Sequence, residues 1–247
     1  MSLGQTASAI RPPTTLAAAG RLLAMCGRYV SPDEAAIERA WTILRGGNPF
    51  TRVFNAAPTM RLPVVRVRDG RHEPCAMHWG LVPGWWSKAE LPQSTINARA
   101  EDAATKPMWR SAVRYSRCLV PSLGWYEWKT DPSRVAKQPY FIHRPARGVF
   151  CFAGLWSEWS PKGGEPLQTF AILTRDAVGD MTQLHNRMPL VLPPDLWAAW
   201  LDPDMKDGAA AVATAQDAAE TAFSWYPVSS YVTSPRNQDV ACMTPLA

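Results

Sequence analysis

The chain has 247 residues, of which 47% are hydrophobic and 19% charged, and it carries a formal net charge of +5. This composition is typical of a soluble globular protein and excludes an intrinsically disordered one; the charge is compatible with a polyanionic partner but too small to establish one. The five cysteines are odd in number and never in CxxC spacing, which argues against a disulfide framework or structural zinc and favours a cytoplasmic location. No apolar stretch approaches the about 18 residues of a membrane span.

Residues 1–25 differ in character from the rest of the chain. They contain two arginines and no acidic residue, and they lack the apolar core of a secretory signal. We interpret them as a leader that is disordered, cleaved, or translated from a start codon placed too early, followed by one domain over 26–247. Removal of Met25 as an initiator would leave Cys26 with a free α-amine beside its thiol. The reference pKa values of these groups are ~7.7–8.0 and ~8.5, so both have reactive forms near neutrality.

In chain order, the expected elements are a few helices among many short strands. Ser31 as N-cap, Pro32 at the first position and Glu34 in a capping box predict a helix that ends near Arg45. A hairpin is expected over 62–79, with a tight turn at Asp69-Gly70. Further strands are expected near 117–121, 124–129, 138–143, 148–156, 167–174, 188–192 and 227–232, and helices over 194–201 and 208–222. These elements predict a single α+β domain with a curved, mostly antiparallel β-sheet or barrel core and a few flanking helices.

Four short segments combine reactive or polar residues with turn residues. They are Cys26–Tyr29, Asn97–Glu101, Gly124–Trp128 and His185–Pro189. Together they offer a thiol with a possible amine, an amide, a carboxyl and an imidazole, which are groups that acyl, imine or thioether chemistry uses.

Glu127 is the most informative of these residues on local grounds. In a strand, Trp125 and Glu127 share one face while Tyr126 and Trp128 share the other. A carboxyl among aromatic rings would be desolvated and its pKa raised towards general-acid work; a solvated, outward carboxyl is an equal alternative. Taken alone, His185 and Asn97 are more typical of ordinary hydrogen-bonding residues than of catalytic ones.

Arginines and tryptophans near these segments suggest contacts with nucleic acid. Arginine binds phosphates through its forked donors, and indoles stack on unpaired bases. Trp85 and Trp86 are adjacent, so we expect one to anchor their loop while the other is exposed. The candidate arginines are Arg28, Arg99, Arg110 and Arg187.

Taken together, these segments resemble the SRAP (SOS response-associated peptidase) family over essentially all of residues 26–247. The motifs that carry the resemblance are Cys26-Gly27-Arg28-Tyr29, Ala57-Pro58-Thr59, Trp79-Gly80-Leu81-Val82-Pro83, Asn97-Ala98-Arg99-Ala100-Glu101, Arg117-Cys118-Leu119-Val120-Pro121, Gly124-Trp125-Tyr126-Glu127-Trp128 and His185-Asn186-Arg187-Met188-Pro189. The resemblance implies a protein of the DNA damage response with a positive groove for single-stranded DNA, in which the N-terminal cysteine captures abasic sites as a thiazolidine.

The resemblance also implies roles for individual residues. Cys26 would be the nucleophile, Asn97 an orienting hydrogen-bonding residue, and Glu127 and His185 the acid–base pair. The expected DNA contacts are Arg28, Pro58, Trp85, Trp86, Arg99, Arg110 and Arg187. We expect a monomer without cofactor or metal, whose partner is single-stranded DNA containing abasic sites.

Two other functions stay open on the sequence. Cys26, His185 and Asn97 match a cysteine peptidase in residue type, acting on other proteins or on the bond after Met25. Without a free amine on Cys26, the chain would be a non-catalytic single-strand binder.

Overall fold

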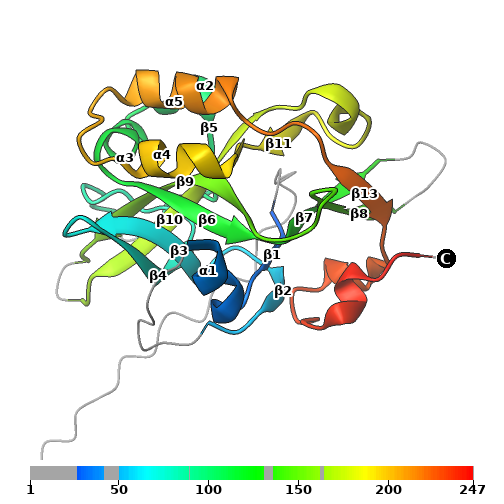
Figure 1. The fold of residues 1–247 in the computed structure, drawn as a ribbon. Helices are drawn as coiled ribbons and strands as arrows, with labels where there is room; N and C mark the ends of the chain where they lie inside the picture. Colours follow the sequence, from blue (N-terminus) through cyan, green and yellow to red (C-terminus); the bar gives the residue numbers. More distant parts are fainter. Residues whose placement is uncertain (1–26, 42–49, 89, 131–135, 162–163, 247) are drawn as a thin grey trace, which may run out of the picture.

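The computed structural model describes residues 27–41, 50–88, 90–130, 136–161 and 164–246. Cys26, the leader and the expected helix end near Arg45 lie outside the described residues. Two sheets with a few helices form one domain (Figure 1). The expected α+β fold with a curved, mostly antiparallel core is confirmed.

The first sheet contains five strands in the order β13-β8-β7-β1-β2. Its strands are β1 (Tyr29–Ser31), β2 (Val53–Ala56), β7 (Gly124–Lys129), β8 (Gln138–His143) and β13 (Ser224–Pro227). All their pairings are antiparallel. The central position of β7, between β8 and β1, places the Gly124–Trp128 motif in the middle of this sheet.

The second sheet contains eight strands and is rolled into a partial barrel. Its strands are β3 (Arg61–Arg68), β4 (Arg71–Trp79), β5 (Asn97–Arg99), β6 (Arg117–Ser122), β9 (Phe150–Trp159), β10 (Leu167–Asp176), β11 (Arg187–Pro189) and β12 (Val191–Leu192). Pairing of β10 with β9 closes the ring β10-β4-β3-β6-β9. Strand β10 also pairs in parallel with β4 and β5, so the sheet is mixed.

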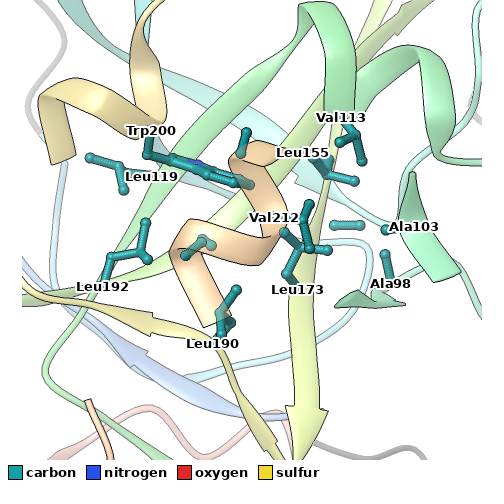
Figure 2. Packing of buried hydrophobic residues seen from close by; sticks show 14 of the residues in the cluster. Ala98, Ala103, Val113, Leu119, Leu155, Leu173, Leu190, Leu192, Trp200 and Val212 are labelled. Carbon is teal, nitrogen blue, oxygen red and sulfur yellow. The ribbon is translucent and has the colours of Figure 1, made fainter. Parts of the chain in front are cut away.

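The described helices are short, and α1 to α5 pack on the barrel whereas η3 and η4 lie against the first sheet. They are α1 (Glu34–Trp41), α2 (Ala100–Ala103), α3 (Arg110–Tyr115), α4 (Trp197–Leu201) and α5 (Gly208–Asp217), with 3₁₀ helices η1 (Gly179–Gln183), η2 (Pro194–Leu196), η3 (Ser230–Thr233) and η4 (Val240–Met243). Figure 2 shows Trp200 and Val212 from these helices packed against Leu119, Leu155 and Leu173 of the strands. Burial of such side chains stabilises the fold by roughly 1.5–3 kcal/mol each.

Several local predictions are confirmed. Asp69 and Gly70 both have positive φ, 51° and 71°, as the tight turn between β3 and β4 requires. The thiols of Cys118 and Cys151 lie in the core, whereas Cys75 is only partly buried. The helix over 194–201 is present as η2 and α4.

Other predictions are wrong at the ends of elements. Ser31 does not cap α1, because it extends β1 opposite Val53; the Asp33 carboxylate instead accepts a hydrogen bond from the Ala36 amide at 3.0 Å. The strand expected over 227–232 lies instead over 224–227, where it pairs with β8 from His143 to Tyr140, and residues 230–233 form η3. The single strand expected over 188–192 is divided into β11 and β12, which pair with different neighbours, and α5 ends at Asp217 rather than 222.

Among the described residues, no helix is long and apolar enough to span a bilayer.

Candidate active site

Strand β7 holds Glu127 in the interior. At the start of the strand, Gly124 allows a close approach to β8: a Cβ at this position would lie 2.3 Å from the ring of Phe141 and 2.5 Å from the carbonyl oxygen of Ile142. Beyond Gly124 the side chains alternate, and Trp125 and Glu127 both point inward. Glu127 is only 2% exposed. Of the two alternatives, the desolvated carboxyl is therefore correct.

The first described residues run alongside this carboxyl. Tyr29 pairs with Trp125 and Val30 with Gly124, and the Tyr126 amide donates to the Arg28 carbonyl oxygen at 3.0 Å. Continuing this antiparallel register by two residues puts Gly27, which is buried, opposite Glu127. The N-terminal end of the described chain is thus directed at the candidate acid.

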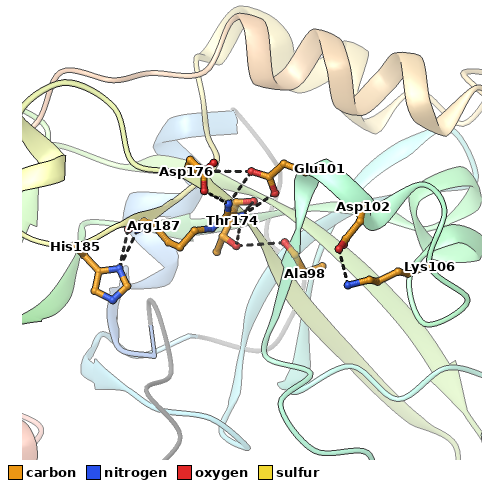
Figure 3. A network of polar contacts seen from close by, with 8 residues as sticks. All are labelled: Ala98, Glu101, Asp102, Lys106, Thr174, Asp176, His185 and Arg187. Atoms are coloured by element: carbon orange, nitrogen blue, oxygen red, sulfur yellow. Dashed lines mark hydrogen bonds and ion pairs between the residues drawn. The ribbon is translucent and has the colours of Figure 1, made fainter.

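His185 follows η1 and is half-buried. Its Nδ1 accepts a hydrogen bond from the Arg187 amide at 3.0 Å, so the neutral ring carries its proton on Nε2 (Figure 3). Burial lowers the pKa of His185 below its usual 6.5, and the positive charges of Lys137 and Arg187 lower it further, although the Arg187 carbonyl acts in the opposite direction. The imidazole is therefore neutral at pH 7.

A cavity of about 450 Å³ opens beside His185. Its described lining residues come from β5, the β7–β8 hairpin and the η1–β11 loop; they are Arg99, Trp128, Lys129, Thr130, Lys137, Gln183, Leu184, His185 and Asn186. Three of these side chains are cationic, and none of the described lining residues is acidic. The cavity is therefore suited to an anionic ligand.

Asn97 and Arg99 both lie on β5, which pairs in parallel with β10. Residues i and i+2 of a strand share a face, so Asn97 lies on the same face of β5 as Arg99, which lines the cavity. Asn97 is half-buried and Arg99 is exposed. The structure thus gathers Arg99 and His185 at one cavity, and Asn97 lies two residues before Arg99 on β5.

Arg187 was expected to contact DNA, but the structure turns its side chain inward. Only 5% of Arg187 is exposed. The guanidinium donates to Glu101 at 2.7 and 2.8 Å, to Asp176 at 2.5 Å and to the Thr174 carbonyl oxygen at 2.8 Å (Figure 3). We therefore do not propose Arg187 as a DNA contact. Its ion pairs hold β11 in place, and its backbone amide, which donates to His185 Nδ1, orients the His185 ring.

Arg187→Met should lower the free energy of unfolding by about 2 kcal/mol. The loss is smaller than for a fully buried ion pair, because the side chains of Glu101 and Asp176 are 41% and 81% exposed and water screens their charges. Burial tends to raise the pKa of Glu101, but hydrogen bonds and charge from Arg187 outweigh it, so the net shift is downward. A carboxylate with a lowered folded pKa stabilises the fold above its unfolded pKa of about 4.3, and this contribution disappears as pH falls through the folded pKa.

Urea denaturation at pH 7 and pH 3 measures this effect. The stability difference between wild type and Arg187→Met should shrink at pH 3. Arg175→Met is the matched control, since the Arg175 guanidinium donates to the Gln216 carbonyl oxygen and has no ion pair among the described residues. An Arg187→Met deficit that is the same at both pH values would contradict the ion-pair explanation.

The remaining predicted DNA contacts are spread over the surface. Trp85 is 57% exposed, whereas Trp86 is half-buried and its carbonyl oxygen accepts from the Trp159 indole at 2.7 Å. One tryptophan therefore anchors the loop, as expected. Trp159, which is bonded to this loop, pairs with the first residue of β10, and Arg187, two residues after His185 of the cavity, pairs with the last. A strand of ten residues is about 30 Å long, so the tryptophan loop and the cavity are about this far apart along β10.

Three further predicted contacts lie away from the cavity lining. Pro58 is half-exposed between β2 and β3, and Arg110 is exposed at the start of α3. Arg28 is half-buried, and its guanidinium donates to Asn55 and to two carbonyl oxygens near the C-terminus.

Sequence reasoning missed Lys129 and Lys137. They flank the loop of the β7–β8 hairpin, where Lys129 pairs with Gln138, the neighbour of Lys137. The signal that could have found them is the lysine that ends the expected strand 124–129 and the lysine that directly precedes the expected strand 138–143.

No group of three or more potential metal ligands gathers among the described parts of the chain.

Comparison with known proteins identifies the family. The chain belongs to the SOS response-associated peptidase (SRAP) family, whose sequence model matches residues 25–235. It is 33% identical over 186 residues to abasic site processing protein YoqW of Bacillus subtilis, covering 74% of this chain and 82% of that protein. It is 32% identical over 232 residues to abasic site processing protein YedK of Escherichia coli, covering 90% of this chain and 100% of that protein. A crystal structure of a Bacteroides thetaiotaomicron protein superposes with a TM-score of 0.69 at 25% identity, over 85% of this chain and 90% of that chain.

Proposed function

We propose that this protein captures abasic sites in single-stranded DNA through Cys26, acting as the N-terminal residue of the mature chain. The observation that carries the proposal is the β1–β7 register, which puts buried Gly27 opposite buried Glu127. Cys26 directly precedes Gly27 in the sequence, so we infer that its amine and thiol react beside this carboxyl. The similarity to proteins named for abasic site processing supports the same substrate.

The proposed reaction needs both nucleophiles of an N-terminal cysteine. The abasic sugar opens from its hemiacetal to the aldehyde by proton transfer. The neutral amine of Cys26 adds to the aldehyde carbon, and loss of the aldehyde oxygen as water gives an imine. The thiolate then attacks the imine carbon, the nitrogen takes up a proton, and a five-membered thiazolidine closes by an effectively intramolecular step.

Glu127 and His185 divide the proton transfers in this proposal. Because the pKa of His185 is lowered, its ring is neutral at pH 7 and is suited to accept a proton or to donate a hydrogen bond from Nε2. The role of proton donor in ring opening therefore falls to Glu127. Asn97, on the face of β5 that carries Arg99, orients the sugar.

The cationic lining of the cavity supports a DNA backbone as the ligand. Arg99 offers a forked guanidinium, and Lys129 and Lys137 offer ammonium groups, with no described carboxylate in the lining to compete. Exposed Trp85, at the other end of β10, supplies a stacking surface for an unpaired base. We propose that the strand follows β10 from this tryptophan to the cavity.

Removing both lysines should weaken single-strand binding. The Lys129→Ala, Lys137→Ala double variant loses two phosphate contacts, so the slope of log K against log salt should fall by about 1.4 and affinity at 0.15 M salt by roughly tenfold. Fluorescence anisotropy with an intact strand, in a Cys26→Ala background, measures binding without cross-linking. The control is Lys106→Ala, Lys206→Ala, which makes the same charge change outside the cavity lining. Equal losses in both double variants would contradict a phosphate site at the hairpin.

The proposed function is tested with the chain that begins at Cys26. Incubated with single-stranded DNA containing one abasic site, it should give a heat-stable band of slower mobility on a denaturing gel. An intact strand should give none, and neither should Cys26→Ala with abasic DNA. A protein that binds intact and abasic strands equally and never cross-links would be a non-catalytic binder instead.

A second candidate is self-cleavage after Met25. It is favoured by the family match, which begins at residue 25 of a family described as peptidases. In this proposal water activated by Glu127 and His185 attacks the Met25 carbonyl carbon, either directly or after the Cys26 thiol has taken over the acyl group as a thioester. The leader leaves with a new carboxylate, and the Cys26 nitrogen takes up a proton. Intact mass of the full chain reports the outcome: loss of residues 1–25 in wild type, with retention in Glu127→Ala, supports self-cleavage, whereas loss in both variants points to another protease.

A further inference from the structure

Asn55 of β2 is a fully buried polar side chain outside the cavity, and it joins the start of the domain to its end. Its Oδ1 accepts from Arg28 Nη1 at 3.0 Å. Its Nδ2 donates to the carbonyl oxygens of Val232 and Ser234, both at 2.9 Å, and Asn237 at 3.2 Å. The side-chain amide of Asn55 thus bonds at both its oxygen and its nitrogen, and it links Arg28 to a segment more than 200 residues further along the chain.

The same C-terminal segment also holds Asn55 by its backbone. Gln238 accepts from the Asn55 amide at 3.1 Å and donates to the Asn55 carbonyl oxygen at 2.9 Å. Tyr231 donates to Asp239 at 2.8 Å within this segment. Figure 1 shows η3 and η4 in red beside β2. We call residues 230–243 the C-terminal clamp.

Arg28 is the residue that the clamp secures. Its Nη1 donates to the Val232 carbonyl oxygen and its Nη2 to that of Thr233, both at 3.2 Å. Its own carbonyl oxygen accepts from the Tyr126 amide, the residue before Glu127. Side chain and backbone of Arg28 are thus fixed to the clamp on one side and to β7 on the other.

We propose that Asn55, with the C-terminal clamp, is a positioning residue for the Cys26 reaction. It holds Arg28, two residues after Cys26, in register with β7, so that the nucleophiles meet the aldehyde beside Glu127. The inference rests on the proposed function. Misplacement of reacting groups by about 1 Å slows a reaction by about a hundredfold, so a loosened Arg28 should slow the covalent step while leaving the cavity cations in place.

Single-turnover cross-linking separates these effects. For the chain beginning at Cys26, the rate at saturating abasic DNA gives the covalent step, and the half-saturating concentration gives binding. Asn55→Ala should lower the saturated rate by at least tenfold and change half-saturation less than twofold. Gln238→Ala, which leaves the Asn55 side chain intact, should lower the rate by a smaller factor. Arg117→Met is the matched control, because Arg117 of β6 is likewise a buried polar side chain that donates to carbonyl oxygens, those of Val113, Trp200 and Asp202.

Hydrogen exchange gives a readout independent of the chemistry. The Tyr126 amide, bonded to the Arg28 carbonyl oxygen, should exchange roughly tenfold faster in Asn55→Ala and in Gln238→Ala, and at an unchanged rate in Arg117→Met. If Asn55→Ala does not fold, the saturated cross-linking rate and the Tyr126 exchange rate are measured on Gln238→Ala alone.

The outcomes separate the two proposals. Absence of a cross-link in wild type overturns the proposed function. A wild type that cross-links, with variants that keep the saturated rate, overturns only the positioning role. Variants that bind DNA more weakly at an unchanged saturated rate would make Asn55 and Arg28 part of the DNA-binding surface. This result would also overturn the positioning role.

Discussion

A single residue left on the α-amine of Cys26 should abolish the covalent link to abasic DNA. In a chain that begins Gly-Cys26, the nitrogen of Cys26 is an amide, which does not attack an aldehyde, so no thiazolidine can form. We expect the cross-linking rate to fall by more than about a thousandfold, the scale of removing an essential nucleophile. The measurement is the single-turnover yield on a denaturing gel, compared with the chain that begins at Cys26.

Cys26→Ser separates the amine from the thiol. It keeps the amine, so the imine still forms, but a hydroxyl closes the ring far less readily than a thiolate. The link should then be lost on heating and preserved by borohydride reduction. Both variants should bind intact strands like wild type, because neither changes the cations of the cavity. Wild-type cross-linking by the Gly-Cys26 chain would move the nucleophile to another residue, with Lys129 and Lys137 of the cavity as the first to test.

The sequence was most informative where a local rule decides the structure. Asp69-Gly70 forms its turn because positive φ is required at both positions. Alternation along β7 places Glu127 on the same face as Trp125, and both side chains are buried. The start of α1 was misjudged because two polar residues, Ser31 and Asp33, can each cap a helix; the pairing of β1 with β2 takes Ser31 and leaves the cap to Asp33.

Long-range contacts could not be predicted in the same way. Arg187 resembles a surface arginine in sequence, yet its partner Glu101 is 86 residues away and becomes a neighbour only through the parallel pairing of β5 with β10. The clamp on Arg28 depends on Asn55 and on a segment more than 200 residues from Arg28. Strand β5 and helix α2 have three and four residues, too short for any periodicity to reveal.

Glu127→Gln should slow capture of an abasic site by about 10²–10³-fold without weakening DNA binding. The amide matches the carboxyl in shape but cannot transfer a proton, and positioned proton transfer contributes 10²–10⁴-fold in enzymes. Glu127 is buried in the described structure, so bulk water is a poor substitute. Single-turnover rates between pH 6 and pH 9 measure the effect. The rise towards the amine pKa of about 8 should persist in the variant, since deprotonation of Cys26 is still needed.

An open-chain aldehyde identifies the step in which Glu127 acts. An oligonucleotide aldehyde that cannot close to a hemiacetal bypasses ring opening, so the deficit of Glu127→Gln should shrink to less than about tenfold on this substrate. His185→Asn is the comparison variant: in the proposed division of roles His185 does not donate the proton that opens the sugar, so its deficit should be similar on both substrates. An undiminished Glu127→Gln deficit on the open aldehyde would place Glu127 in imine formation or ring closure, and would assign the opening of the sugar to a different group.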